Sequence, residues 1–70
     1  MNKIIIRDEN IKLGQALKLC GAVGSGVEAK ILINEGYVTV NGEVCYQRGK
    51  KLIAGDVISL RNEEYIISKE

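Results

Sequence analysis

The chain has 70 residues, of which 46% are hydrophobic, and it carries a formal net charge of +1. This length predicts one domain over residues 1–70 with a small core, and the apolar content argues against disorder. No apolar run approaches the ~20 residues of a membrane span, and the first residues do not resemble a signal peptide. We therefore expect a cytoplasmic protein with no membrane partner.

The first part of the chain is predicted to be a strand followed by a short helix. Three consecutive isoleucines within residues 3–6 favour a buried or half-buried strand. Apolar residues then recur at helical spacing from Leu13 to Cys20. They predict a first helix over about 13–19 that ends near Gly21.

A second helix is predicted to begin at Ser25 and to end before Gly36. Ser25 and Glu28 have the spacing of a capping box. In this motif the Ser25 hydroxyl accepts from the Glu28 amide, and the Glu28 carboxylate reaches back to Ser25. Ala29 and the apolar residues three and four positions on form one stripe. Gly36 stops the helix because a left-handed backbone is cheap only for glycine.

The remainder of the chain alternates strands and turns. Alternating valines at 38–40 predict a strand, Asn41-Gly42 a hairpin turn, and 43–46 the returning strand. A basic loop follows over 47–51. Two more strands are expected at 57–60 and 64–68, the last of them near the N-terminal strand. These elements predict an α+β fold, a two-helix hairpin packed on a small, mostly antiparallel, twisted sheet.

The charges are unevenly distributed along the chain. Residues 12–51 contain six basic and three acidic residues, a net charge of +3, whereas residues 52–70 contain two basic and four acidic residues, a net charge of −2. The positive segment includes both predicted helices and the basic loop. An anionic partner is therefore expected to bind this segment.

Residue types that carry catalysis or hold metals are scarce. The chain has no histidine, and Cys20 and Cys45 lie too far apart to supply a four-ligand zinc site. In a reducing compartment we expect both to be small buried apolar residues, not a disulfide. No nucleophile lies beside a base, and no pair of carboxylates falls on a predicted buried face. We therefore predict a protein that is not an enzyme and has no metal or cofactor.

The ordered motifs resemble one RNA-binding family. Lys12-Leu13, the serine-capped helix, its glycine stop, the Val-Thr-Val-Asn-Gly segment at 38–42 and Gly55-Asp56-Val57-Ile58 are similar to the domain named after ribosomal small-subunit protein S-four. The resemblance runs from Lys12 to about Leu60 and is closest to stand-alone members. It implies the S-four-like fold with its alpha-L motif. It also implies a non-catalytic module that binds structured RNA, with ribosomal RNA, a ribosomal particle or a tRNA-like molecule as partner.

Carried over by position, the resemblance implies RNA contacts on both helices and in the basic loop. The implied residues are Lys12 on the first helix, Ser25, Gly26 and Lys30 on the second, and Arg48, Lys50 and Lys51 in the loop. Many members have arginine where this chain has Gly26, and aspartate where it has Gly14. The chain thus lacks one phosphate-binding guanidinium fork.

The aromatic residues and one lysine allow two interpretations. Tyr46 precedes the basic loop and is a candidate to stack on an unpaired base, the alternative being a partly buried packing role. Tyr37 and Tyr65 are expected to pack. Lys18 is expected either to contact RNA or only to keep the protein soluble.

Two other functions fit part of the sequence. A small protein–protein adaptor would use its sheet for binding, and its basic loop would only aid solubility. A β-grasp-like carrier would need a Gly-Gly end, which Ser68-Lys69-Glu70 does not provide. We expect a monomer.

Overall fold

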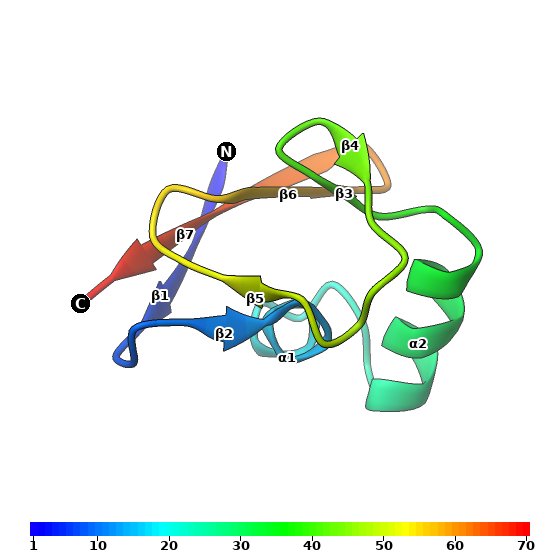
Figure 1. The fold of residues 1–70 in the computed structure, drawn as a ribbon, viewed down its shortest axis with the longest axis horizontal. Coiled ribbons are helices and arrows are strands. Elements are labelled where there is room, and N and C mark those ends of the chain that lie inside the picture. The colour runs from blue at the N-terminus through cyan, green and yellow to red at the C-terminus, as the bar shows by residue number, and fades with distance from the viewer.

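Two helices and seven strands make up the protein, as seen in a computed structural model that describes residues 1–70. The predicted α+β class is confirmed, with the two helices packed on one side of a sheet (Figure 1). Neither helix is long and apolar enough to cross a membrane. In chain order the elements are β1 (Asn2–Ile6), β2 (Ile11–Lys12), α1 (Leu13–Leu19), α2 (Gly26–Asn34), β3 (Thr39–Val40), β4 (Glu43–Val44), β5 (Lys51–Leu52), β6 (Val57–Leu60) and β7 (Glu63–Lys69).

The main sheet has five strands in the order β1-β7-β6-β3-β4. All neighbours are antiparallel except β1 and β7, which run parallel with Asn2 opposite Tyr65. The expectation that the last strand lies near the first is therefore confirmed. The short strands β2 and β5 form a separate antiparallel pair, in which Ile11 faces Leu52. The sequence did not predict this pair, because two residues are too few to show a strand pattern.

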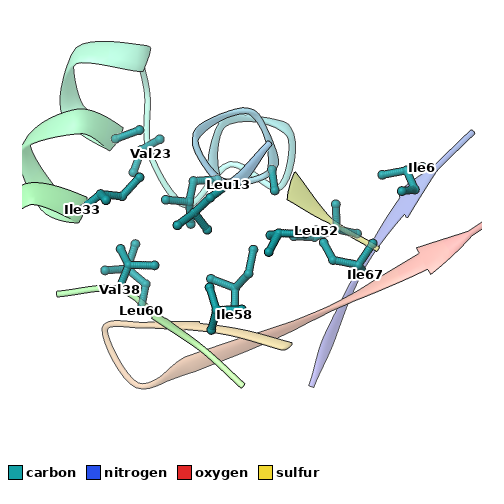
Figure 2. Packing of buried hydrophobic residues seen from close by; sticks show 14 residues of the cluster. Ile6, Leu13, Val23, Ile33, Val38, Leu52, Ile58, Leu60 and Ile67 are labelled. Atoms are coloured by element: carbon teal, nitrogen blue, oxygen red, sulfur yellow. The ribbon is translucent and has the colours of Figure 1, made fainter. Parts of the chain in front are cut away.

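The core fills the space between the helices and the sheet (Figure 2). Leu13 and Leu17 of α1 and Ile33 of α2 are fully buried against strand residues such as Ile58 and Ile67. The helical stripes predicted from apolar spacing thus face the sheet. Burial of such side chains is the dominant favourable contribution to folding in a domain of this size.

Cys20 and Cys45 pack against this core as free thiols, but both are only half-buried. The prediction that both cysteines are buried was therefore wrong, because each side chain is partly exposed to solvent. Cys20 caps the C-terminus of α1, and Cys45 follows the last residue of β4, so each lies where the chain leaves the core.

The predicted cap of α2 is confirmed at its hydroxyl and wrong at its carboxylate. The Ser25 Oγ accepts a hydrogen bond from the Glu28 amide at 3.1 Å. The Glu28 carboxylate does not accept from the Ser25 amide but from the Gly24 amide, one residue earlier, at 2.8 Å, so it satisfies a donor just outside the helix. Gly36 ends the helix with a φ of +83°, as expected.

The β3–β4 hairpin has the predicted turn but a shorter second strand than predicted. Asn41 and Gly42 have φ values of 52° and 86°, which is the left-handed pair that a tight type I′ turn requires. The return strand ends at Val44 instead of Tyr46. Cys45 still donates from its amide to the Val38 carbonyl at 3.0 Å. The chain then leaves the sheet and descends to the start of α1 (Figure 1).

Candidate nucleic-acid interface

The loop after β4 is fixed to the first turn of α1 by its own backbone. The Leu13 amide donates to the Lys50 carbonyl at 2.9 Å, and the Gly14 amide donates to the Arg48 carbonyl at 3.0 Å. The amides of the first helical turn have no acceptor within their own helix, so the carbonyls of the loop accept their hydrogen bonds. The basic loop is therefore a positioned part of the structure, packed at the N-terminus of α1.

Gly14 allows the Arg48 side chain to cross this first turn. A Cβ added at Gly14 would lie 2.6 Å from Arg48 Cγ and 3.2 Å from Arg48 Cδ. Real Cβ atoms essentially never show a contact as short as 2.6 Å, so any other residue at position 14 would displace the arginine stem. The sequence signalled Gly14 only as a departure from the family pattern; the structure gives it a packing role.

A polar hollow of about 340 Å³ lies between α1, the start of α2 and the loop. It contains three cationic side chains, three glycines, one glutamine, no acidic residue and no hydrophobic residue. Gly14 and Lys18 are four positions apart on α1 and so share one helix face. We call this site the polar hollow; its lining residues are Lys12, Gly14, Gln15, Lys18, Gly26, Arg48 and Gly49.

The cations around the polar hollow have no ion-pair partners. The two ion pairs of the chain, Arg7 with Glu70 and Lys69 with Glu9, both lie where β1 and β7 end. None of the six basic residues of 12–51 takes part in either. Lys12 even lies directly opposite Lys51 in the β2–β5 pair, an arrangement that is unfavourable without a bound anion.

The predicted RNA-contact residues fall into two groups. Lys12, Gly26 and Arg48 line the polar hollow, and Lys51 lies opposite Lys12. Lys30 is exposed one helical turn beyond Gly26, on the same face of α2.

Ser25 caps the helix immediately before Gly26. Lys50 and Tyr46 do not line the polar hollow. They line a second hollow beside the hairpin.

The sequence did not point to Gln15 as a site residue, and it left open whether Lys18 contacts RNA or only aids solubility. Gln15 and Lys18 both line the polar hollow. The available signal was their spacing on the face of α1 opposite its buried residues Ala16 and Leu17.

The second hollow measures about 480 Å³ and lies along the edge strand β4. It mixes apolar side chains with one carboxylate, two amides and one lysine. Tyr46 is exposed, and Tyr37, expected to pack, is exposed as well. We call this site the hairpin hollow; its lining residues are Val40, Asn41, Glu43, Val44, Cys45, Tyr46, Gln47 and Lys50.

Residues 4–68 of this chain match the S4 domain family. The chain belongs to the S4 domain family. One relative of this S4 domain is RlbA of Bacillus subtilis (strain 168), a probable ribosome maturation protein. The two sequences are 46% identical over 59 residues, and the alignment covers 84% of this chain and 83% of RlbA. The RNA-binding family predicted from the motif order is thus confirmed.

Solved structures of S4 domain relatives agree with the fold. The solution structure of Escherichia coli YbcJ, which contains an alpha-L motif involved in RNA binding, matches with a TM-score of 0.74 and 32% identity over 97% of this chain and 87% of YbcJ. The 30S ribosomal protein S4e of Thermoplasma acidophilum matches with a TM-score of 0.65 over 86% of this chain and 32% of its own. At 23% identity, S4e supports the fold alone.

One ionisable group of this S4 domain, the Tyr65 hydroxyl, has a raised pKa. Partial burial raises the pKa of Tyr65, with smaller upward contributions from Cys20 and Glu63 and a downward one from Arg61. Tyr65 lies on β7 outside both hollows. No group of three or more His, Cys, Asp or Glu side chains is placed to hold a metal ion. The polar hollow offers three cations without ion-pair partners beside the uncovered backbone of Gly26 and Gly49.

Proposed function

We propose that this chain is a non-catalytic module that docks on structured RNA, with ribosomal RNA or a ribosomal particle as its target. The observation that carries the proposal is the polar hollow, where Lys12, Lys18 and Arg48 converge without an acidic neighbour. Like-signed charges without partners suit a polyanion. The names of the relatives RlbA and YbcJ, which concern ribosome maturation and RNA binding, support the same conclusion.

In this mechanism α1, the start of α2 and the loop hold one segment of RNA backbone. Lys12, Lys18 and Arg48 neutralise phosphates, and Lys30 extends the cationic surface along α2. The amides of Gly26 and Val27 begin α2 before its first intrahelical bond, so they can donate to a phosphate oxygen. Such contacts fix register and read the shape of the RNA more than its sequence.

Two glycines of the polar hollow, Gly26 and Gly49, matter because they let the backbone of the RNA approach closely. Neither carries a Cβ, and both line the hollow. Gly26 and Gly49 have nothing within 4 Å of an added Cβ, so the space above them is open. The missing arginine at position 26 thus leaves free amides at the helix start where many relatives place a guanidinium.

The test is the salt dependence of binding to ribosomal RNA fragments, measured by filter binding. With roughly four to five phosphate contacts, the log–log slope should be about 3–4. Lys18→Gln and Arg48→Gln should each reduce that slope by about 0.7–0.9 and weaken binding to all fragments alike. Lys3→Gln is the matched control, because Lys3 is also an exposed cation without an ion pair but lies on β1.

A protein–protein adaptor predicts a different result. Its RNA binding would vanish at near-physiological salt, and Lys18→Gln would behave like Lys3→Gln. Either finding would refute the proposed function.

A further inference from the structure

Tyr46 presents an aromatic ring to solvent just where the chain leaves the sheet. Its exposed fraction is 62%, and it is absent from the group of partly buried residues that pack against the core. The preceding residue, Cys45, donates a hydrogen bond from its backbone amide to the Val38 carbonyl and packs against the core. The chain therefore directs one side chain inward at Cys45 and leaves the next ring outside.

The ring is nevertheless supported from one side. A Cβ added at Gly36 would lie 3.3 Å from Tyr46 Cε1 and 3.4 Å from its Oη. The edge of the ring thus rests beside the glycine that ends α2. A supported, exposed aromatic ring loses little entropy when a flat partner stacks on it.

The other groups of the hairpin hollow suit a base better than a phosphate. The hollow holds one carboxylate, Glu43, as well as one cation, Lys50, whereas the polar hollow holds three cations and no acid. The Gln47 side-chain amide offers both a donor and an acceptor to the edge of a base. A volume of about 480 Å³ falls within the roughly 300–1,000 Å³ of small-ligand sites.

The two hollows share one loop. Arg48 and Gly49 line the polar hollow, while Tyr46, Gln47 and Lys50 line the hairpin hollow. We infer that the hairpin hollow receives an unpaired RNA base, stacked on Tyr46, from a nucleotide next to the backbone segment in the polar hollow. This inference rests on the proposed function and adds an aromatic base-binding site to it. Lys50 would contact the phosphate of the extruded nucleotide.

The probes are three stem-loop RNAs that share one duplex. One carries a single bulged adenosine, one carries an abasic residue at the bulge, and one is fully paired. The abasic bulge keeps the phosphate charge and the bend but lacks the base. Wild-type protein should bind the adenosine bulge roughly 5- to 150-fold more tightly than the abasic bulge, the range expected for stacking of one base on an aromatic side chain.

Two variants and one control assign that preference to the ring. Tyr46→Ala should abolish the preference and leave binding to the paired stem unchanged. Tyr46→Phe should retain it, because stacking needs the ring and not the hydroxyl. Tyr37→Ala is the matched control, since Tyr37 is 64% exposed and lines a separate hollow with Leu32, Leu60 and Arg61. It should behave as wild type.

The preference should also persist as salt is raised, because stacking involves no counterion release, whereas overall binding falls. Equal affinity of the wild type for the adenosine and abasic bulges would overturn the base site and leave RNA docking in place. Retention of the preference in Tyr46→Ala would likewise overturn it. If the wild-type protein binds none of the three stems at near-physiological salt, the proposed function is refuted as well.

Discussion

The Arg48 carbonyl accepts a hydrogen bond from the Gly14 amide at 3.0 Å, and the Arg48 side chain crosses the position that a Cβ on residue 14 would occupy. The two residues lie in different segments of the chain, and both line the polar hollow. The glycine and the arginine therefore act as a pair, because the side chain of one fits only where the other has none.

Gly14→Ala should weaken RNA binding about as much as Arg48→Ala does. The added methyl group must displace the Arg48 stem, and a charge-assisted phosphate contact contributes roughly 1.5–3 kcal/mol, so the loss should be about tenfold or more. Stability should stay within about 1 kcal/mol, since alanine is the better helix former. Binding titrations and chemical denaturation check both expectations.

A double-variant cycle makes this prediction specific. If Gly14 acts through Arg48, the double variant should bind no more weakly than Arg48→Ala alone. Gly24→Ala is the control, because nothing lies within 4 Å of a Cβ at Gly24. Additive losses in the double variant would show that Gly14 affects RNA binding by another route.

Lys12→Glu should stabilise the fold while weakening RNA binding. Lys12 is the N-cap of α1, whose first turn has no acidic residue, and it lies opposite Lys51. A carboxylate there complements the helix dipole by about 0.3–1 kcal/mol and removes a like-charge pair. The melting temperature at low salt should rise by a few degrees, and the salt slope of RNA binding should fall. A variant that is both less stable and unaffected in binding would contradict the assignment.

Ser25→Ala should cost about 1 kcal/mol of folding free energy. The Ser25 hydroxyl accepts from the Glu28 amide at 3.1 Å, and alanine would leave that first-turn donor without its partner. In a domain of this size the melting temperature should fall by roughly 4–8 °C. Ser25→Asp serves as the control, because aspartate caps as well as serine. An unchanged melting temperature for Ser25→Ala would show that the cap contributes no net stability.

Gly36→Ala should destabilise the fold by more than about 1 kcal/mol. Gly36 has a φ of +83°, which alanine adopts only with strain, and its new Cβ would lie 3.3 Å from the Tyr46 ring. The urea midpoint should fall without a change in slope. Gly49→Ala, at a glycine without positive φ and with open space around it, should leave the midpoint nearly unchanged. A common response of both variants would show that backbone strain is not the cause.

Local patterns predicted most of the fold because they depend on residues close in sequence. The spacing from Leu13 onward defined α1, and Asn41-Gly42 defined the hairpin turn. The length of β4 was wrong because the loop bonds to Leu13 and Gly14 draw the chain out of the sheet after Val44. No local sequence pattern predicts these hydrogen bonds, because their partners lie more than 30 residues apart in the chain.

The candidate site was predictable only in part, for the same reason. Lys12, Gly26 and Arg48 followed from the family resemblance, and they do line one hollow. Their convergence depends on three separate segments meeting, which no spacing along the chain encodes. Lys18 was not assigned because its place in the polar hollow depends on the loop, which lies far away in the sequence.

The parallel pairing of β1 with β7 delays completion of the sheet until the end of protein synthesis. Asn2 opposes Tyr65 and Ile6 opposes Lys69, so the first strand has no partner until the last strand has left the ribosome. The α1–α2 hairpin and the β3–β4 turn consist of contacts between near neighbours and can form earlier, because short loops close at lower entropic cost. During translation the core residues Ile4 and Ile6 of β1 therefore remain exposed until β7 is made, and completion of the sheet waits for the final residues of β7.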